Sequence, residues 1–273
     1  MFESLTLRIL ELARDTMFRA GFVYNKHMEG IPKKLNKITG DQMNVLTAHK
    51  STILSQEKSS QNNQVAESIT VEAVSVPFDD KERTIELVKK SFDNTSQPEN
   101  AFENYRIAKE AGLKVVPTYR LEDGGTSIYM TNLAAGDRVA ITGNNTIPEK
   151  ASGFSYEKLP DNFNNFLSSY FEQATIATLR GLKLYADMPM FTFDTSNSED
   201  IELDFFIADF DTYIADVSSE KTADELIHIN LDQLQGALLS SLSNIMNLDN
   251  WEEIRLSIIA DRDRFEEHFI ENN

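Results

Sequence analysis

Several features that define common protein classes are missing from this chain. It contains no cysteine, which excludes a disulfide framework, a thiolate zinc site and a cysteine nucleophile. No apolar run approaches the roughly 20 residues that span a bilayer, and the first residues lack the basic region and cleavage site of a signal peptide. Together these absences predict a soluble, cytoplasmic protein.

Glycine is absent from a long stretch, and glycine-dependent motifs are missing. No glycine lies between Gly40 and Gly112. The chain has no Gly-x-x-x-x-Gly-Lys-Ser/Thr loop, which excludes an ordinary nucleotide triphosphatase, and no Gly-x-Ser-x-Gly element of a hydrolase. The four histidines lack metal-ligand spacing, so we expect surface or helix-packing roles for them. They are His27, His49, His228 and His268.

Basic residues are scarce in the C-terminal third. The net charge of the chain is −18, and residues 194–273 hold 20 acidic and 4 basic residues, against 24 and 22 before them. Such a field repels a polyanion, so nucleic-acid binding through phosphate contacts is disfavoured. Three interpretations remain open, namely a solvated surface, a basic protein partner and mimicry of nucleic acid.

The N-terminal half alternates between strand and helix patterns. Residues 5–19 have the apolar spacing of an amphipathic helix, residues 20–54 are unassigned, and residues 55–68 form a polar stretch that predicts a loop. Alternating patterns predict a hairpin of strands 69–76 and 84–92, and further strands over 114–121 and 126–133. Between them a helix is expected from Ser96, which can cap it, to Gly112.

The C-terminal half is mostly helical. Residues 134–160 contain three glycines and two prolines and are expected to be a connector. A long, largely buried helix follows, with Leu179 on its widened apolar face, and then short strands over 190–193 and 203–208. Helices are expected over 223–246 and 250–270. We therefore predict an α+β chain divided into residues 1–54, 55–133, 134–160 and 161–273.

Acidic side chains stand where two of these patterns end. The long helical pattern ends in a segment that reaches Asp187, and the apolar run over 205–208 is followed by Asp209 and Asp211. A small antiparallel sheet with one inserted helix, a connector, and a mostly helical part with a short strand pair resemble, over roughly residues 65–245, a two-lobed protein-kinase-like phosphotransferase. The resemblance implies a kinase-like architecture with an N-lobe and a helical C-lobe.

In this family a lysine on the third strand holds nucleotide phosphates and pairs with a glutamate on the next helix. The resemblance implies that Lys89 and Glu103 are this pair, with Lys90 as the other choice of register. Neighbouring strand residues point to opposite faces, so only one of the two lysines can enter the cleft.

The resemblance assigns further roles around ATP and magnesium, the implied ligands. Met130 and Asn132 would lie at the hinge, where backbone groups meet the base. Asp187 would orient the acceptor hydroxyl and take its proton. Asp209 and Asp211 would be metal ligands, because a divalent cation on phosphate prefers carboxylate oxygen.

Three departures from the family pattern indicate a degenerate member. The position of the second metal ligand, normally asparagine, is Thr192; the glycine-rich phosphate loop is absent; and no Ala-Pro-Glu element follows Asp211. Asp211 itself replaces the glycine of the Asp-Phe-Gly element, as in small-molecule and atypical kinases. The rival interpretation is an acidic calcium cluster, although the regular spacing of calcium loops is missing. Its members would be Asp194, Asp200, Asp204, Asp209 and Asp211.

Two functional hypotheses follow. The first is a nucleotide-binding, pseudokinase-type protein with possible residual ATP- and magnesium-dependent phosphotransfer. The second is an acidic interaction protein, of the inhibitor, immunity or nucleic-acid-mimic type, that binds a basic protein partner.

Overall fold

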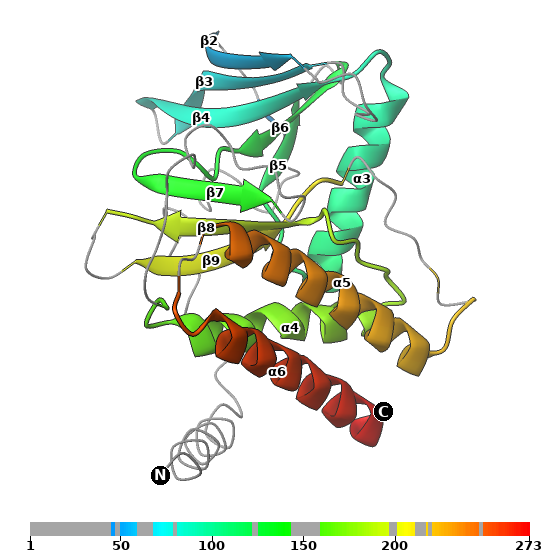
Figure 1. Cartoon of the computed structure of the whole chain (residues 1–273). Coiled ribbons are helices and arrows are strands. Elements are labelled where there is room, and N and C mark those ends of the chain that lie inside the picture. Colours follow the sequence, from blue (N-terminus) through cyan, green and yellow to red (C-terminus); the bar gives the residue numbers. More distant parts are fainter. Residues whose placement is uncertain are drawn as a thin grey trace. The chain divides into compact units, whose positions relative to one another are not determined.

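The structure is a computed structural model that describes residues 45–46, 50–58, 68–78, 81–121, 125–142, 159–196, 201–210, 217, 220–245 and 248–273. The chain divides between Asp41 and Gln42, and every described residue belongs to the second unit. The helix expected over residues 5–19, and Asp211, lie outside the described residues. The described part is an α+β fold with two sheets (Figure 1).

The first sheet has six strands in the order β1-β5-β6-β4-β3-β2. The predicted hairpin is confirmed as β3 and β4, which pair antiparallel along their whole length. β1 pairs parallel with β5, and the other neighbours are antiparallel. The strands are β1 (Val45–Leu46), β2 (Lys50–Lys58), β3 (Ser68–Phe78), β4 (Lys81–Ser91), β5 (Thr118–Leu121) and β6 (Ser127–Thr131).

One strand of this sheet contradicts the sequence interpretation. β2 extends to Lys58, so residues 55–58 are not part of a loop, and the strand crosses the boundary expected between residues 54 and 55. Its polar side chains gave no alternating apolar signal. Pairing with β3 over eight registered residues supplies the backbone hydrogen bonds that hold the strand instead.

Helix α3 (Ser96–Ala111) ends where the sequence predicts. Gly112 has a φ of +97°, a left-handed conformation that suits glycine, and its N–H donates to the carbonyl of Lys109 at 3.0 Å. The predicted serine cap is wrong, because the side chain of Asn94 accepts from the backbone N–H groups of Ser96 and Gln97.

The second sheet has three antiparallel strands in the order β7-β8-β9. The predicted strand pair is confirmed as β8 (Pro189–Asp194) and β9 (Glu202–Ile207). The third strand, β7 (Arg138–Thr142), lies within the expected connector. Its five residues form a strand by pairing with β8, a partner that lies about fifty residues away in the sequence and that local patterns cannot reveal.

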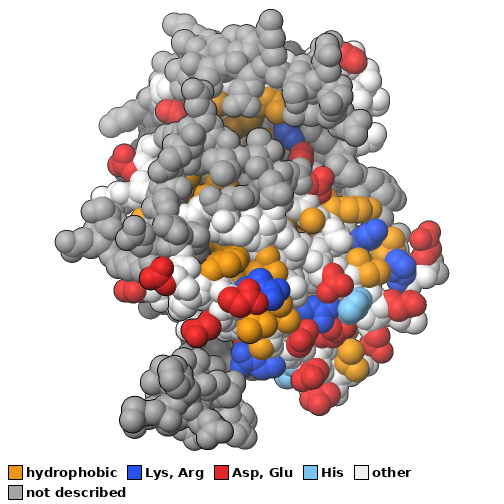
Figure 2. All heavy atoms as spheres, in the orientation of Figure 1, with side chains coloured by type: hydrophobic (Ala, Val, Ile, Leu, Met, Phe, Trp, Pro, Cys, Tyr) orange, Lys and Arg blue, Asp and Glu red, His pale blue; other side chains and the backbone are white. Residues whose placement is uncertain are grey.

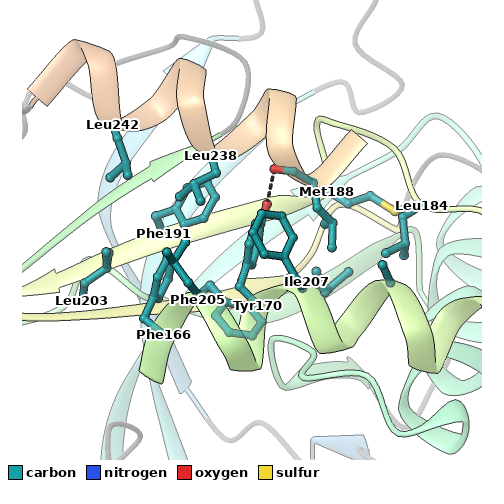
Figure 3. Packing of buried hydrophobic residues seen from close by; sticks show 14 of the residues in the cluster. Phe166, Tyr170, Leu184, Met188, Phe191, Leu203, Phe205, Ile207, Leu238 and Leu242 are labelled. Atoms are coloured by element: carbon teal, nitrogen blue, oxygen red, sulfur yellow. Dashed lines mark hydrogen bonds between the residues drawn. The ribbon is translucent and has the colours of Figure 1, made fainter. Parts of the chain in front are cut away.

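Helices α4 (Phe163–Leu179), α5 (Ala223–Ile245) and α6 (Trp251–Asn272) pack with this sheet around one large core. Figure 3 shows aromatic rings of α4 against rings of β8 and β9, namely Phe166, Tyr170, Phe191 and Phe205. The Tyr170 hydroxyl donates to the carbonyl of Leu234 in α5 at 2.9 Å. Burial of each such ring stabilises the fold by roughly 1.5–3 kcal/mol.

The buried stripe of α4 agrees with the prediction except at its end. Leu179 is 60% exposed and does not belong to the buried face. None of the helices in the described ranges is long and apolar enough to cross a membrane.

The segment between α3 and β5 joins the two sheets. The Ile207 N–H donates to the carbonyl of Lys114 at 2.7 Å, and the Val116 N–H donates to the carbonyl of Ile207 at 2.9 Å. Val115 thereby forms a parallel bridge to the edge of β9 that β8 leaves open. The end of β9 is therefore fixed to the chain that enters the six-stranded sheet.

Candidate functional site

The register of β4 places its two neighbouring lysines on opposite faces of the sheet. Lys89 stands opposite Thr70 and Tyr129, whereas Lys90 stands opposite Ile69 and Ile128. Ile128 packs with Ala101 of α3, so Lys90 is on the face that α3 covers and Lys89 is on the other face.

The side chain of Lys90 extends from the six-stranded sheet to the segment after β9. Its Nζ donates to the Oδ1 of Asp209 in a close ion pair between side chains that are 11% and 39% exposed. The two residues are 119 positions apart in the sequence. Of the two lysines that the sequence left open, Lys90 therefore lies with the aspartate of the expected metal site.

Lys89 does not form the expected ion pair with Glu103. Its Nζ lies 3.4 Å from the Oε1 of Glu72, whose side chain is 3% exposed, and 5.7 Å from the ring centre of Tyr129. Burial by itself lowers the pKa of Lys89, but the interactions with Tyr129 and Glu72 outweigh it, so the net pKa is raised. Lys89 serves as the counter-ion of a buried acid.

Glu103 is also displaced from its expected place. Its carboxylate is 56% exposed and binds Arg106 at 2.9 Å, one turn along α3. The next residue, Asn104, is buried, and its Nδ2 donates to the carbonyl of Phe210 at 3.0 Å. One residue turns a helix by about 100°, so the face toward Asp209 carries the amide and not the acid.

The backbone at Asp209 adopts an unusual conformation. Asp209 has a φ of +57°, and no other non-glycine residue in the described ranges has a positive φ. This left-handed conformation costs about 1 kcal/mol for a residue with a side chain. Such conformations persist only where the surroundings enforce them, and they concentrate at functional sites.

The loop that carries Asp187 is held by two amides of α5. The Oδ1 of Asn230 accepts from the Leu184 N–H at 2.8 Å, and its Nδ2 donates to the carbonyl of Leu182 at 2.9 Å. The Oε1 of Gln233 accepts from the Ala186 N–H at 2.9 Å. Asp187 is half-buried in the turn that follows.

Asp187 and Asp209 come to the same end of the β8–β9 hairpin. β8 begins two residues after Asp187, and β9 ends two residues before Asp209. The Ala208 N–H donates to the carbonyl of Met188 at 2.8 Å, so the chain segments next to the two aspartates are directly hydrogen-bonded. The structure thus brings Asp187, Asp209 and Lys90 to one region of the fold.

The expected hinge residues lie at the end of β6. Met130 is buried and stands opposite Val88, on the face that carries Lys90. The Asn132 N–H donates to the carbonyl of Glu86 at 3.2 Å, and its own carbonyl accepts from the Ala135 N–H at 3.3 Å. Both backbone groups of Asn132 are therefore already hydrogen-bonded. The part of this segment that lies on the Lys90 face is the side chain of Met130.

Thr192 does not lie at the end of the hairpin with Asp187 and Asp209. It is buried inside β8, opposite Ala140 and Asp204. At about 3.3 Å per strand residue, it is roughly 10 Å along the strand from the first residue of β8.

Of the five aspartates considered as a calcium cluster, Asp200 and Asp211 lie outside the described residues, and the other three pair with different basic side chains. Asp194 lies 3.6 Å from Arg138, Asp204 binds Lys114, and Asp209 binds Lys90. Hydrogen bonds from the Ser196 hydroxyl and backbone N–H lower the pKa of Asp194. In the parts of the chain that the structure describes, no three acidic or histidine side chains are grouped as metal ligands would be.

Three residues of this region were missed by the sequence interpretation: Asn104, Asn230 and Gln233. A signal for Asn230 exists, since it occupies a position of the apolar stripe formed by Leu226, Ile227, Leu231 and Leu234. A polar residue inside such a stripe needs buried hydrogen-bond partners. Asn104 and Gln233 carry no comparable signal.

Comparisons with known proteins give a limited result. Neither protein-family models nor curated proteins show a match. Among solved structures, the chain is similar to the Helicobacter pylori proinflammatory kinase CtkA at a TM-score of 0.34 and 13% identity, over 73% of this chain and 94% of that one. At these values the likeness assigns no activity.

A second similar structure is the complex of Neurospora crassa PAN2 (WD40-CS1) with PAN3 (pseudokinase and C-term). The TM-score is 0.38 and the identity 16%, over 84% of this chain. The match spans 58% of the Neurospora chain. Both likenesses are to kinase-like proteins and both are weak.

Proposed function

We propose that this protein is a kinase-like nucleotide-binding protein of the pseudokinase type, which binds ATP with magnesium. In this proposal the six-stranded sheet with α3 acts as an N-lobe, and the three-stranded sheet with α4, α5 and α6 acts as a C-lobe. The observation that carries the proposal is the ion pair between Lys90 of β4 and Asp209 after β9. A cation and a carboxylate from different sheets are the two groups that a metal-bound phosphate needs.

The residues present fit magnesium bound together with a nucleotide. Magnesium typically takes one or two carboxylates and fills its other positions with phosphate oxygens and water. Asp209 is the carboxylate that would hold the ion, and Lys90 would bind phosphate as a point charge.

Residual phosphotransfer would depend on Asp187. Its carboxylate would orient an acceptor hydroxyl and take its proton, a role that depends on its position beside that hydroxyl. The position of Thr192 inside β8 supports binding over catalysis, because this residue is not beside Asp187 and Asp209 as a second metal ligand. We therefore rank nucleotide binding above catalysis.

Calorimetric titration with ATP and magnesium tests the proposal, using wild type, Lys90→Ala, Asp209→Ala and the neighbouring control Lys89→Ala. Each protein is measured below its melting temperature. We expect binding by wild type and by Lys89→Ala, because Lys89 lies on the face of the sheet opposite to Lys90. Lys90→Ala and Asp209→Ala are expected to lose magnesium-dependent binding. Equal binding by Lys90→Ala would contradict the proposed site.

A thermal-shift assay supplies an independent readout. A ligand at one hundred times its Kd stabilises the native state by about 2.7 kcal/mol, which raises the melting temperature measurably. The proposed function would be overturned if wild type responded to no nucleotide in both the calorimetric and the thermal-shift assay.

One observation favours the alternative of an acidic interaction protein. Each arginine of α6 is paired within the helical part: Arg255 with Glu252, Arg264 with Asp261, and Arg262 with acids of α5 and α6. The arginines of α6 thus already have acidic partners within this part of the chain. Figure 2 shows acidic side chains, mixed with basic and hydrophobic ones, over the face where α5 and α6 lie. Salt-sensitive association with a basic protein, without any response to nucleotide, would favour this alternative.

A further inference from the structure

Helix α3 contacts the residue that follows Asp209 at two points. The Nδ2 of Asn104 donates to the carbonyl of Phe210 at 3.0 Å, and the ring of Tyr105 meets the ring of Phe210 edge-on at 5.9 Å. Both α3 residues and Phe210 are buried. Consecutive residues of one helix thus hold the main chain and the side chain of Phe210.

The residue before Asp209 is held as well. The Ala208 N–H donates to the carbonyl of Met188, and Ala208 is almost completely buried. Asp209 therefore lies between two anchored residues, and its left-handed φ of +57° is fixed from both sides. The direction of its carboxylate depends on these anchors, because the strained backbone would relax if one of them were released.

From this arrangement we infer that Asn104 is a positioning residue for Asp209. Its amide holds the Phe210 carbonyl and so keeps the Asp209 carboxylate in the orientation that receives a divalent cation. The inference rests on the proposed function, and it adds a residue of α3 that the family resemblance does not supply. An acid in this place could not donate to the carbonyl of Phe210 unless it were protonated.

Two variants of Asn104 test whether binding depends on its hydrogen bond to Phe210 and not on the shape or charge of the side chain. Asn104→Leu removes the donor and adds no charge, and Asn104→Asp keeps the shape while presenting oxygen to the Phe210 carbonyl. Glu103→Gln is the matched control, since Glu103 is the adjacent exposed residue. ATP affinity is measured by calorimetry with magnesium and with EDTA in its place.

We expect both Asn104 variants to weaken the binding of ATP with magnesium about tenfold, the ratio that corresponds to one buried hydrogen bond. ATP binding in EDTA and all binding by Glu103→Gln are expected to stay at the wild-type level. An equal loss with and without magnesium would show a merely structural role and overturn the inference. Unchanged or tighter magnesium-dependent binding in either Asn104 variant would also overturn it.

Amide hydrogen exchange in the ligand-free protein separates this inference from the proposed function. Asn104→Leu is expected to accelerate exchange at the amide of Ala208, which donates to the carbonyl of Met188 next to Asp209, and Glu103→Gln to leave it unchanged. Wild-type protection of this amide in Asn104→Leu would overturn the positioning role even if wild type binds ATP. Faster exchange in a protein that binds no nucleotide would support the hold on Asp209 and reject only the proposed function.

Discussion

Two adjacent lysines of β4 meet different surroundings on the two faces of one sheet. Lys89 neutralises Glu72, an acid whose side chain is 3% exposed, among residues of the same sheet. The side chain of Lys90 extends away from the sheet and pairs with Asp209, which follows β9 and whose side chain is 39% exposed. The first pair holds a buried acid within one sheet, with a lysine that is itself 28% exposed, and the second joins distant parts of the chain.

The difference separates a lysine that stabilises the fold from the lysine that we propose to bind phosphate. Removal of Lys89 would leave the buried carboxylate of Glu72 without its ion-pair partner, which lowers the stability of the fold. Water already reaches the carboxylate of Asp209, so Lys90 can exchange partners at a low cost. The comparison therefore predicts opposite effects of substitution at the two positions, large on stability at Lys89 and large on ligand binding at Lys90.

The largest expected effect on stability is that of Lys89→Met. This substitution leaves Glu72 buried without its counter-ion, and we expect a loss of about 3 kcal/mol in the free energy of unfolding. Because the pKa of Lys89 is raised in the folded protein, the contribution of the pair is present below pH 10.5 and is lost as the pH rises through the folded-state pKa. Denaturant unfolding at pH 8 measures the loss.

The double variant Lys89→Met with Glu72→Leu is the control for this prediction. Replacing both members of a buried pair by apolar residues of similar size is often close to neutral, so most of the lost stability is expected to return. A double variant as unstable as Lys89→Met would show that Lys89 acts through something other than the charge of Glu72.

Tyr119 offers a test of the same sheet face through pH, with a smaller effect. Burial raises the pKa of Tyr119 to about 12, against a smaller opposite effect of the Thr131 hydroxyl. The unfolded chain ionises near pH 10 and the folded protein does not, so the native state loses stability between about pH 10 and pH 12. Tyr119→Phe removes this loss and is expected to gain about 1 kcal/mol on wild type at pH 11 relative to pH 8.

Denaturant unfolding of wild type and Tyr119→Phe at the two pH values measures the difference. Identical pH dependence of the two proteins would show that the Tyr119 hydroxyl is not enclosed as the structure describes. The sheet face that carries Lys89 would then be more open to water than its counterpart.

The smallest expected effect on stability is that of Lys90→Met. Asp209 stays in contact with water, so we expect a loss below about 1 kcal/mol, as for other pairs that are partly exposed. Denaturant unfolding at pH 8 compares it with Lys89→Met. A loss at Lys90 larger than that at Lys89 would reverse the comparison on which the assignment of the two residues rests.

Much of the fold could be predicted because local patterns report which residues are buried. The short apolar runs of β8 and β9, the stripe of α6 and the glycine after α3 each reflect forces acting within a few residues. β7 was not predicted because it forms a strand only by pairing with β8. β2 was not predicted in full because its polar residues are held by pairing with β3 and show no apolar pattern.

The candidate site was predicted only to within one residue at two of its positions. In Lys89–Lys90 both neighbours are lysine, so the strand period cannot show which of them faces α3. On α3 the resemblance favoured the acid Glu103, whereas the helix turns Asn104 toward Phe210. Asp209 could be identified because a strand end fixes its place without any choice of register.

The amide side chains that hold the two aspartates have a consequence for measurements at different pH. Asn104, Asn230 and Gln233 carry no ionisable group, so the loops that they fasten keep these bonds under mildly acidic and mildly alkaline conditions. A pH profile of the proposed nucleotide binding over that range would therefore record the charges of the ligand and of the groups that touch it, and not a loss of these hydrogen bonds. The charges at the proposed site can therefore be titrated without a change in the amide hydrogen bonds that hold its loops.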